Sequence, residues 1–182
     1  MPHTPPDPRS PKDAWDEQHG LLAGNPVAWA LKADELISAF EILVTEFEER
    51  AESAPSGPRF SSVALMLGGF AIEVLLKGLL VQKEAPINTK GKFIYGSHHL
   101  IQLAEDAELP LSEDERRLLE KLEEFLTWAG RYPISLESGP MRPRKTPSGG
   151  FAPRTYGNPS EDWPAIRTLI EKLRQLSTIG AV

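Results

Sequence analysis

The sequence predicts an all-α protein, a four- to five-helix up-and-down bundle with one long loop rich in proline and glycine before its last helix. Several stretches repeat apolar residues at spacings of three and four, which is typical of amphipathic helices. Residues 62–83 form an almost continuous apolar run, which predicts a central helix covered by other helices. No stretch shows the strict alternation of a half-buried strand.

Length and composition predict one globular domain. The chain has 182 residues, a net charge of −6 and no cysteine, which excludes disulfides and thiolate chemistry. Residues 1–20 are rich in proline and are expected as a disordered tail, so that the domain covers residues 21–182. No apolar segment of a signal peptide is present near the N-terminus, and we expect a cytoplasmic protein. The acidic balance excludes a surface that coats nucleic acid all round, but it leaves room for a local basic patch.

The first two bundle helices are delimited by capping residues and prolines. Asn25 followed by Pro26 predicts the start of a helix that runs to about residue 53. The central helix is expected over residues 60–84. Two charged residues, Glu73 and Lys77, and three glycines interrupt its apolar run, so we expect a core helix and no membrane association. Gly69, without a side chain, is expected to let another helix approach closely.

The remaining helices follow in the second half of the chain. Ser97 is expected to cap a short third helix, and Ser112 with Glu115 forms a capping box that opens a fourth. Gly130 suits the C-cap of that fourth helix. The long loop then spans residues 130–160, and the last helix is expected to begin with Ser160 or Asp162 as its cap.

Two charged residues on the central helix are the first candidate site. Glu73 and Lys77 are four residues apart and therefore lie on one helix face in the favourable order. One interpretation is a polar pair that faces a cleft or a dimer seam and positions a phosphate or a partner. The other is a structural ion pair at the rim of the core.

The adjacent histidines His98 and His99 are the second candidate site. Neighbouring residues on a helix point about 100° apart, so these two do not form a chelating pair. We expect no metal and no cofactor. One histidine is expected to form a hydrogen bond within the bundle, with a catalytic role as the alternative.

Basic and aromatic residues after the fourth helix form the third group. Arg131 beside Tyr132 offers hydrogen-bond donors and a stacking face to a phosphate or a base. Between residues 140 and 156 the loop has no acidic residue, and basic loops with aromatic residues suit single-stranded RNA. A mobile, solubilising loop is the alternative. The loop cations are Arg142, Arg144, Lys145 and Arg154.

The motif order over roughly residues 60–135 resembles the HEPN superfamily of prokaryotic helical-bundle proteins. The motifs are AIEVLLK at 71–77, GSHHL at 96–100 and RYP at 131–133. The resemblance implies a bundle that is commonly dimeric. It also implies a role around RNA or nucleotides, often in defence, stress response or toxin–antitoxin pairs. Many members are metal-independent ribonucleases with an arginine followed a few residues later by a histidine. This chain lacks that motif, because no arginine lies between Arg59 and the histidines and none of the four histidines follows Arg131.

The leading hypothesis is a non-catalytic HEPN-like domain that binds RNA, a nucleotide or a partner protein. One alternative is a metal-independent ribonuclease that uses His98, His99, Lys77 and Arg131. A second is a structural homodimer that packs through Gly68 and Gly69 of the central helix. The expected binding residues are Glu73, Lys77, His99, Arg131, Tyr132, Arg142, Arg144, Lys145 and Arg154.

Overall fold

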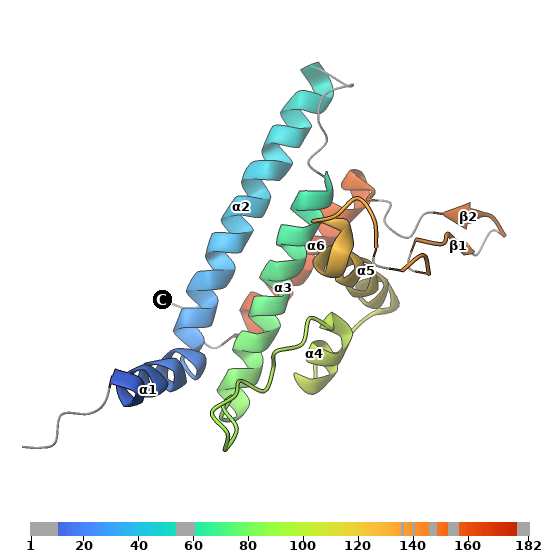
Figure 1. Ribbon diagram of the computed structural model, residues 1–182. Helices are drawn as coiled ribbons and strands as arrows, with labels where there is room; N and C mark the ends of the chain where they lie inside the picture. Colours follow the sequence, from blue (N-terminus) through green and yellow to red (C-terminus); the bar gives the residue numbers. More distant parts are fainter. Residues whose placement is uncertain are drawn as a thin grey trace, which may run out of the picture.

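The protein is all-α, with its helices packed around the central helix α3 (Figure 1). The computed structural model describes residues 11–53, 61–135, 137–139, 141–145, 149–152 and 157–177. The helices are α1 Pro11–Ala23, α2 Pro26–Ser53, α3 Ser61–Lys83, α4 Leu100–Asp106, α5 Glu113–Glu124, the π-helix η1 Phe125–Ala129 and α6 Pro159–Leu176. The described part of the loop also contains the two-residue strands β1 Arg144–Lys145 and β2 Phe151–Ala152.

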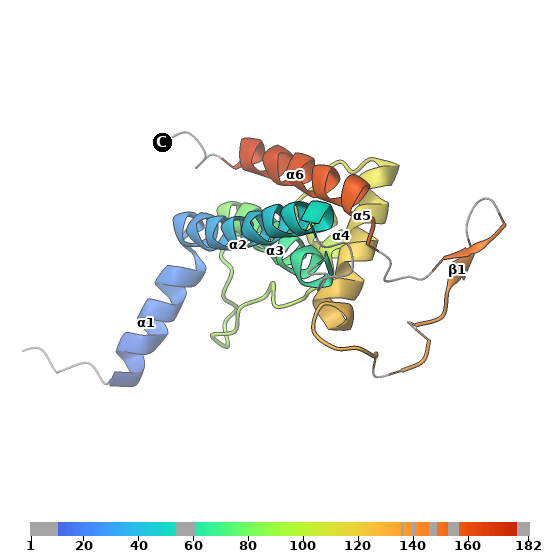
Figure 2. The same cartoon turned by 90° about the horizontal axis from the view of Figure 1, so that it is seen from above.

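The long helices α2 and α3 lie antiparallel, and α6 packs beside both (Figures 1 and 2). The side chain of Asn25 accepts a hydrogen bond from the backbone N–H of Val27 at 3.0 Å, which confirms the predicted start of α2. Arg167 of α6 binds Glu41 of α2, with 2.6 Å between Arg167 Nη2 and Glu41 Oε2. The core between these helices consists of fully buried apolar residues such as Phe40, Ile72 and Ile166.

The glycines of α3 allow neighbouring helices of the same chain to approach closely. A Cβ atom on Gly68 would lie 3.1 Å from Ile166 of α6, and one on Gly69 would lie 3.2 Å from Leu126 of η1. The close approach predicted at Gly69 is therefore confirmed. The expectation that Gly68 and Gly69 form a seam between protomers is wrong, because both are buried inside one chain. A homodimer through another surface stays a prediction.

The capping box of α5 is present as predicted. The backbone N–H of Ser112 donates to Glu115 Oε2 at 2.7 Å, and Ser112 Oγ accepts from the backbone N–H of Glu115 at 3.2 Å. Helix α5 widens into η1, where the N–H of Gly130 donates to the carbonyl oxygen of Phe125 at 3.1 Å. Gly130 is the C-cap of η1, but its backbone φ of −79° is right-handed, so the position does not need a glycine for a left-handed conformation. The position needs a glycine because of crowding, since a Cβ atom there would lie 2.5 Å from the Cβ of Met66.

Three boundaries differ from the sequence predictions. Residues 11–20, expected in the disordered tail, belong to helix α1, because the segment after Pro11 contains no further proline. Helix α4 begins at Leu100 with His99 as its N-cap, and Ser97 instead accepts a hydrogen bond from the backbone N–H of His99. Helix α6 has Asn158 as its N-cap rather than Ser160 or Asp162. Residues 1–10 lie outside the described part of the chain.

Helix α3 is the one helix among the described residues that is long and apolar enough to cross a membrane. Of its most apolar window, 67% is buried within the fold, as in the core helix of a bundle. Its two interior charged side chains, Glu73 and Lys77, are both buried and paired with each other. The interior of α3 therefore contains a polar centre.

Candidate functional site

The polar centre of α3 begins with a buried ion pair. Glu73 and Lys77 are 4% and 6% exposed, and Lys77 Nζ lies 2.7 Å from Glu73 Oε1. The helix positions the two side chains one turn apart on the face that turns toward α4 and α5. Burial of two opposite charges has a desolvation cost that only close pairing and further hydrogen bonds can offset. The pair is therefore a structural ion pair within the core, rather than at the rim of the core as one interpretation expected.

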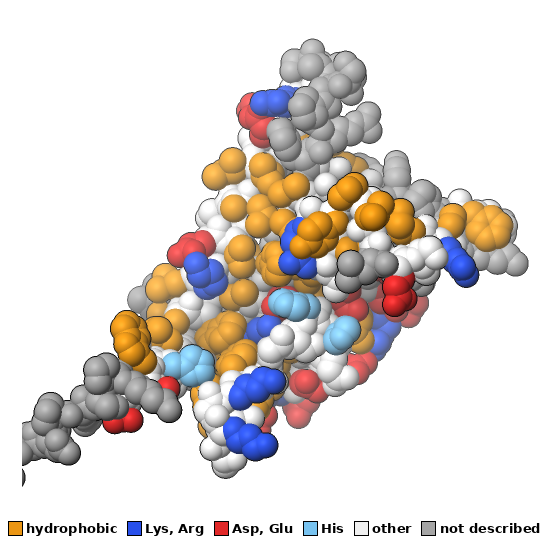
Figure 3. All heavy atoms as spheres, viewed as in Figure 1, with side chains coloured by type: hydrophobic (Ala, Val, Ile, Leu, Met, Phe, Trp, Pro, Cys, Tyr) orange, Lys and Arg blue, Asp and Glu red, His pale blue; other side chains and the backbone are white. Residues whose placement is uncertain are grey.

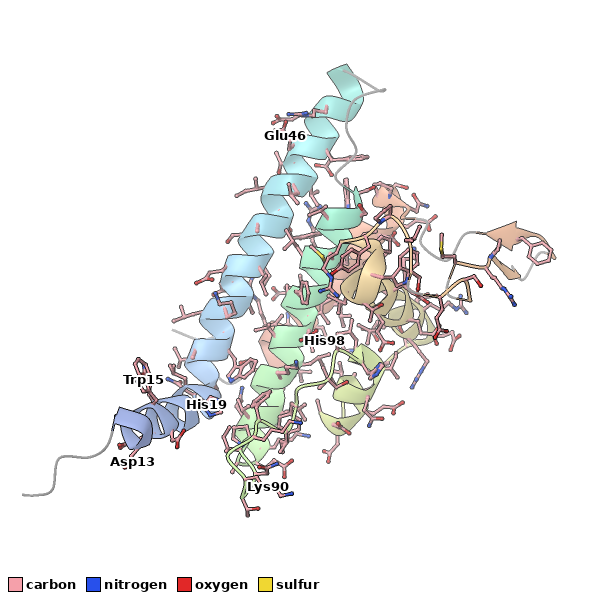
Figure 4. The ribbon with its side chains drawn as sticks, in the orientation of Figure 1. Asp13, Trp15, His19, Glu46, Lys90 and His98 are labelled. Atoms are coloured by element: carbon pink, nitrogen blue, oxygen red, sulfur yellow. The ribbon has the colours of Figure 1, made fainter. Side chains whose placement is uncertain are left out.

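His98 joins this pair from the segment that leads into α4 (Figure 4). Its Nδ1 lies 2.8 Å from Glu73 Oε2, so the second carboxylate oxygen is also occupied. An ionised carboxylate only accepts, and therefore the Nδ1–H of His98 donates. The imidazole packs edge-on against Phe70, with 6.3 Å between the ring centroids. The prediction that one histidine forms a hydrogen bond within the bundle is confirmed.

The outer half of His98 faces solvent. Its side chain is 57% exposed, and within the described part of the chain Nε2 has no hydrogen-bond partner. His99, by contrast, caps α4 and makes no described contact with Glu73. Figure 3 shows histidine side chains at the surface of this face. Only one of the two histidines is therefore oriented by Glu73. Among the described residues, no group of three or more acidic or histidine side chains could hold a metal.

Arg131 stabilises the end of η1. Its Nη2 donates to the carbonyl oxygens of Leu126 and Thr127, both at 2.8 Å. The guanidinium carbon lies 5.5 Å from the centroid of the Tyr132 ring, a cation–π distance. Part of the donor capacity of Arg131 is therefore used within the fold, and its guanidinium group lies beside the ring of Tyr132.

A groove of about 710 Å³ opens beside η1, and we call it the η1 groove. Its walls come from the last turns of α5–η1 and from the irregular segment that follows, and hydrophobic side chains gather over this region in Figure 3. The indole N–H of Trp128 donates to Glu124 Oε2 at 2.9 Å, so a carboxylate is held beside an aromatic wall. The lining residues include Glu124, Trp128, Tyr132, Pro133, Ile134 and Glu137.

Sequence analysis identified Tyr132 as a candidate residue but did not predict the groove. The feature that could have indicated the groove is a pair of apolar side chains that stay exposed directly after a helix end, with Ile134 63% and Tyr132 57% exposed. Among the described residues, no lysine or arginine lines the groove, whereas two glutamates do. The groove is therefore acidic and aromatic, which does not match a phosphate.

The loop cations lie on a separate projection, which we call the basic arm and define by residues 141–145 and 149–152. The arm extends away from the bundle (Figures 1 and 2). Strands β1 and β2 pair antiparallel with Lys145 opposite Phe151, and Gly149 adopts a φ of +86° that favours glycine. Phe151 is 74% exposed and Arg142 is also exposed. Arg154 lies outside the described residues.

The predicted site residues thus fall into three places. Glu73, Lys77 and His98 come together inside the bundle, while Tyr132 borders the η1 groove and the basic arm stands apart. Comparison of the chain with protein-family models, curated proteins and solved structures finds no match.

Proposed function

We propose that this protein is a non-catalytic, HEPN-like helical domain that binds single-stranded RNA through the basic arm. The observation that supports this most is Phe151, an aromatic ring 74% exposed and paired across the strands with Lys145. Exposed aromatic rings stack with bases of any sequence, and neighbouring cations contact the phosphates. Following the HEPN resemblance, we also propose a role in prokaryotic defence, stress response or a toxin–antitoxin pair.

Charge distribution favours the arm over the bundle as the RNA surface. The whole chain carries a net charge of −6, and Glu113, Asp114 and Glu120 are exposed on α5. Salt screens such charges beyond a Debye length of about 8 Å at physiological ionic strength. A projecting segment without acidic residues can therefore attract phosphate although the protein as a whole is acidic.

The test is a fluorescence-anisotropy titration of labelled single-stranded RNA at two salt concentrations. We expect Arg144→Glu/Lys145→Glu to abolish binding, and Phe151→Ala to weaken it by about 5- to 150-fold, the range for loss of one stacked base. Wild-type affinity is expected to fall steeply as salt rises, because phosphate contacts release counterions.

A matched control distinguishes the effect of the arm residues from the effect of a change in net charge. Lys90→Glu/Lys92→Glu makes the same change in net charge on an exposed turn, and Lys90 lies far from the arm in Figure 4. This variant is expected to bind RNA nearly as well as the wild type. Equal loss in both double variants, or unchanged affinity in the arm variant, contradicts the proposal.

The geometry of His98 favours one alternative, a metal-independent ribonuclease. Glu73 fixes the imidazole through Nδ1 and leaves Nε2 exposed, which is the arrangement of a general acid or base. Full-length RNA incubated with the wild type and with His98→Ala distinguishes the two functions. Cleavage that is lost in His98→Ala and kept in His99→Ala would establish the alternative, whereas intact RNA bound by the wild type supports the binding module.

A further inference from the structure

The η1 groove has the chemistry of a docking site for a basic, proline-containing segment. Trp128 and Tyr132 supply aromatic faces on which proline rings pack, as in the grooves that bind polyproline II segments. Glu124 and Glu137 supply two carboxylates that can pair with arginine or lysine. Among the described residues that line the groove, the charged side chains are both acidic.

The helical side of the groove is anchored within the fold. The π-helix η1 forms part of its wall, and Gly130, which has no side chain, lets the end of that helix lie close to Met66 of α3. Arg131 donates to the carbonyl oxygens of Leu126 and Thr127 in η1 and packs over the ring of Tyr132. A preformed groove loses little conformational entropy on binding, and π-helices are frequent at functional sites.

The chain itself carries a segment with the matching chemistry. Residues 141–145 of the basic arm read Met-Arg-Pro-Arg-Lys, so that one proline lies between cations, and the sequence has no acidic residue between positions 138 and 160. Pro143 restricts its own backbone and that of Arg142 to extended conformations, which lowers the entropy cost of docking. In the structure the arm extends away from its own bundle (Figures 1 and 2), and Arg142 is exposed.

We propose that the η1 groove of one copy binds the basic arm of a second copy. Arg142 and Arg144 pair with Glu124 and Glu137, and Pro143 packs between Trp128 and Tyr132. Two copies can exchange their arms reciprocally, which closes a twofold dimer. One consequence rests on the proposed function: RNA and the groove compete for the same arm, so RNA opens the dimer.

A charge-swap experiment tests the docking directly. Groove variant Glu124→Lys/Glu137→Lys and arm variant Arg142→Glu/Arg144→Glu are each examined by sedimentation velocity at low salt, alone and mixed. We expect the wild type to associate, each variant alone to associate at least about tenfold more weakly, and the mixture to recover association through the swapped charges. Added salt is expected to weaken every one of these contacts.

Two control measurements show whether a loss of association comes from the groove itself rather than from misfolding or from the change in net charge. Asp16→Lys/Glu17→Lys makes the same charge change as the groove variant on exposed α1, and it is expected to associate like the wild type. A labelled synthetic peptide with the sequence of residues 140–146 is expected to bind the wild type and not the groove variant. A wild type that stays monomeric at low salt, or a groove variant that associates as the wild type does, overturns the inference.

The outcome is independent of the RNA proposal. If the groove variant binds RNA while no arm docking is found, the inference fails and the proposed function stands. If the mixture recovers association while no protein binds RNA, the docking stands and the proposed function fails. If both hold, RNA added to the wild type is expected to shift it toward monomer.

Discussion

Glu73 Oε2 accepts a hydrogen bond from His98 Nδ1 at 2.8 Å, and the same carboxylate pairs with Lys77 through its other oxygen at 2.7 Å. One buried side chain of α3 thereby neutralises a buried cation and orients an exposed imidazole 25 positions further along the chain. A single carboxylate thus holds two partners, a buried lysine on its own helix and a histidine from the segment before α4.

Removal of Glu73 is expected to destabilise the protein strongly. In Glu73→Ala the ammonium group of Lys77 stays buried without a partner, which costs about 3–5 kcal/mol of the free energy of unfolding. The double variant Glu73→Leu/Lys77→Met removes both charges and is expected to lie close to the wild type or above it. Urea denaturation of the three proteins measures these values.

His98 provides the control for that prediction. His98→Gln keeps Lys77 paired with Glu73 and changes a side chain that is 57% exposed, so we expect a loss of at most about 1.5 kcal/mol. A loss in His98→Gln as large as that in Glu73→Ala would mean that the hydrogen bond to His98, rather than the ion pair, maintains the centre.

Gly130→Ala is expected to disturb the packing of η1 on α3. The new methyl group would lie 2.5 Å from the Cβ of Met66 and 2.8 Å from the carbonyl oxygen of Phe125, and neither atom is the end of a flexible side chain. We expect a loss of about 1–3 kcal/mol in the free energy of unfolding, from overpacking. Thermal denaturation measures it, with Gly96→Ala as the control, since a Cβ atom at Gly96 has no neighbour within 4 Å.

The helices with local signals could be predicted from the sequence. Asn25 with Pro26, and Ser112 with Glu115, act within one turn of the helices that they begin, so their chemistry is visible in a short window. The apolar run of α3 predicted its central position for the same reason. The proline content of residues 1–20 as a whole predicts a disordered tail, but α1 begins at Pro11, the last proline of this segment.

The site depended on contacts between distant segments. The pattern placed Glu73 and Lys77 on one face but could not show that His98 reaches the same carboxylate. The close approach of Gly130 to Met66 likewise joins positions 64 apart in the chain. The η1 groove lies between a helix end and the irregular segment after it, and the periodicity of apolar residues says nothing about the path of such a segment.

Lys172 is expected to give the stability of the protein an acid-sensitive component. Its Nζ donates to the carbonyl oxygen of Pro110 at 2.7 Å and to Glu115 Oε1 at 2.8 Å, which ties α6 to the start of α5. Burial raises the pKa of the Glu115 carboxyl, but hydrogen bonds from Lys172 and Ser112 outweigh this and lower that pKa overall. The folded protein therefore binds this proton less readily than the unfolded chain does.

The stabilisation by the pair of Lys172 and Glu115 is thus present above the usual pKa of glutamate, and it is lost as pH falls through the lowered pKa of Glu115. We expect Lys172→Met to lose about 1–2 kcal/mol at neutral pH, with the difference from the wild type shrinking below about pH 4. Denaturation curves at several pH values measure this. Arg117→Met, which removes an exposed pair with Glu113, is the control and is expected to lose at most about 1 kcal/mol at any pH.

Tyr95 is expected to make the stability of the protein depend on pH in the alkaline range as well. Its hydroxyl donates to Glu84 at the end of α3, and burial together with this carboxylate raises the pKa of Tyr95 to about 12. Since the unfolded chain releases the same proton near pH 10, the contribution is complete below about pH 10 and declines as pH rises toward the folded pKa.

Ultraviolet absorbance of tyrosinate against pH measures this titration directly. In Tyr95→Phe the late-titrating tyrosine is expected to disappear, and stability is expected to lose its dependence on pH between about 10 and 12 relative to the wild type. Glu84→Gln removes the negative charge but keeps an oxygen acceptor, so it is expected to lower the pKa of Tyr95 while leaving its burial in place. An unchanged titration in Glu84→Gln would assign the raised pKa to burial alone, and a Tyr95 that ionises near pH 10 in the wild type would contradict the buried hydrogen bond altogether.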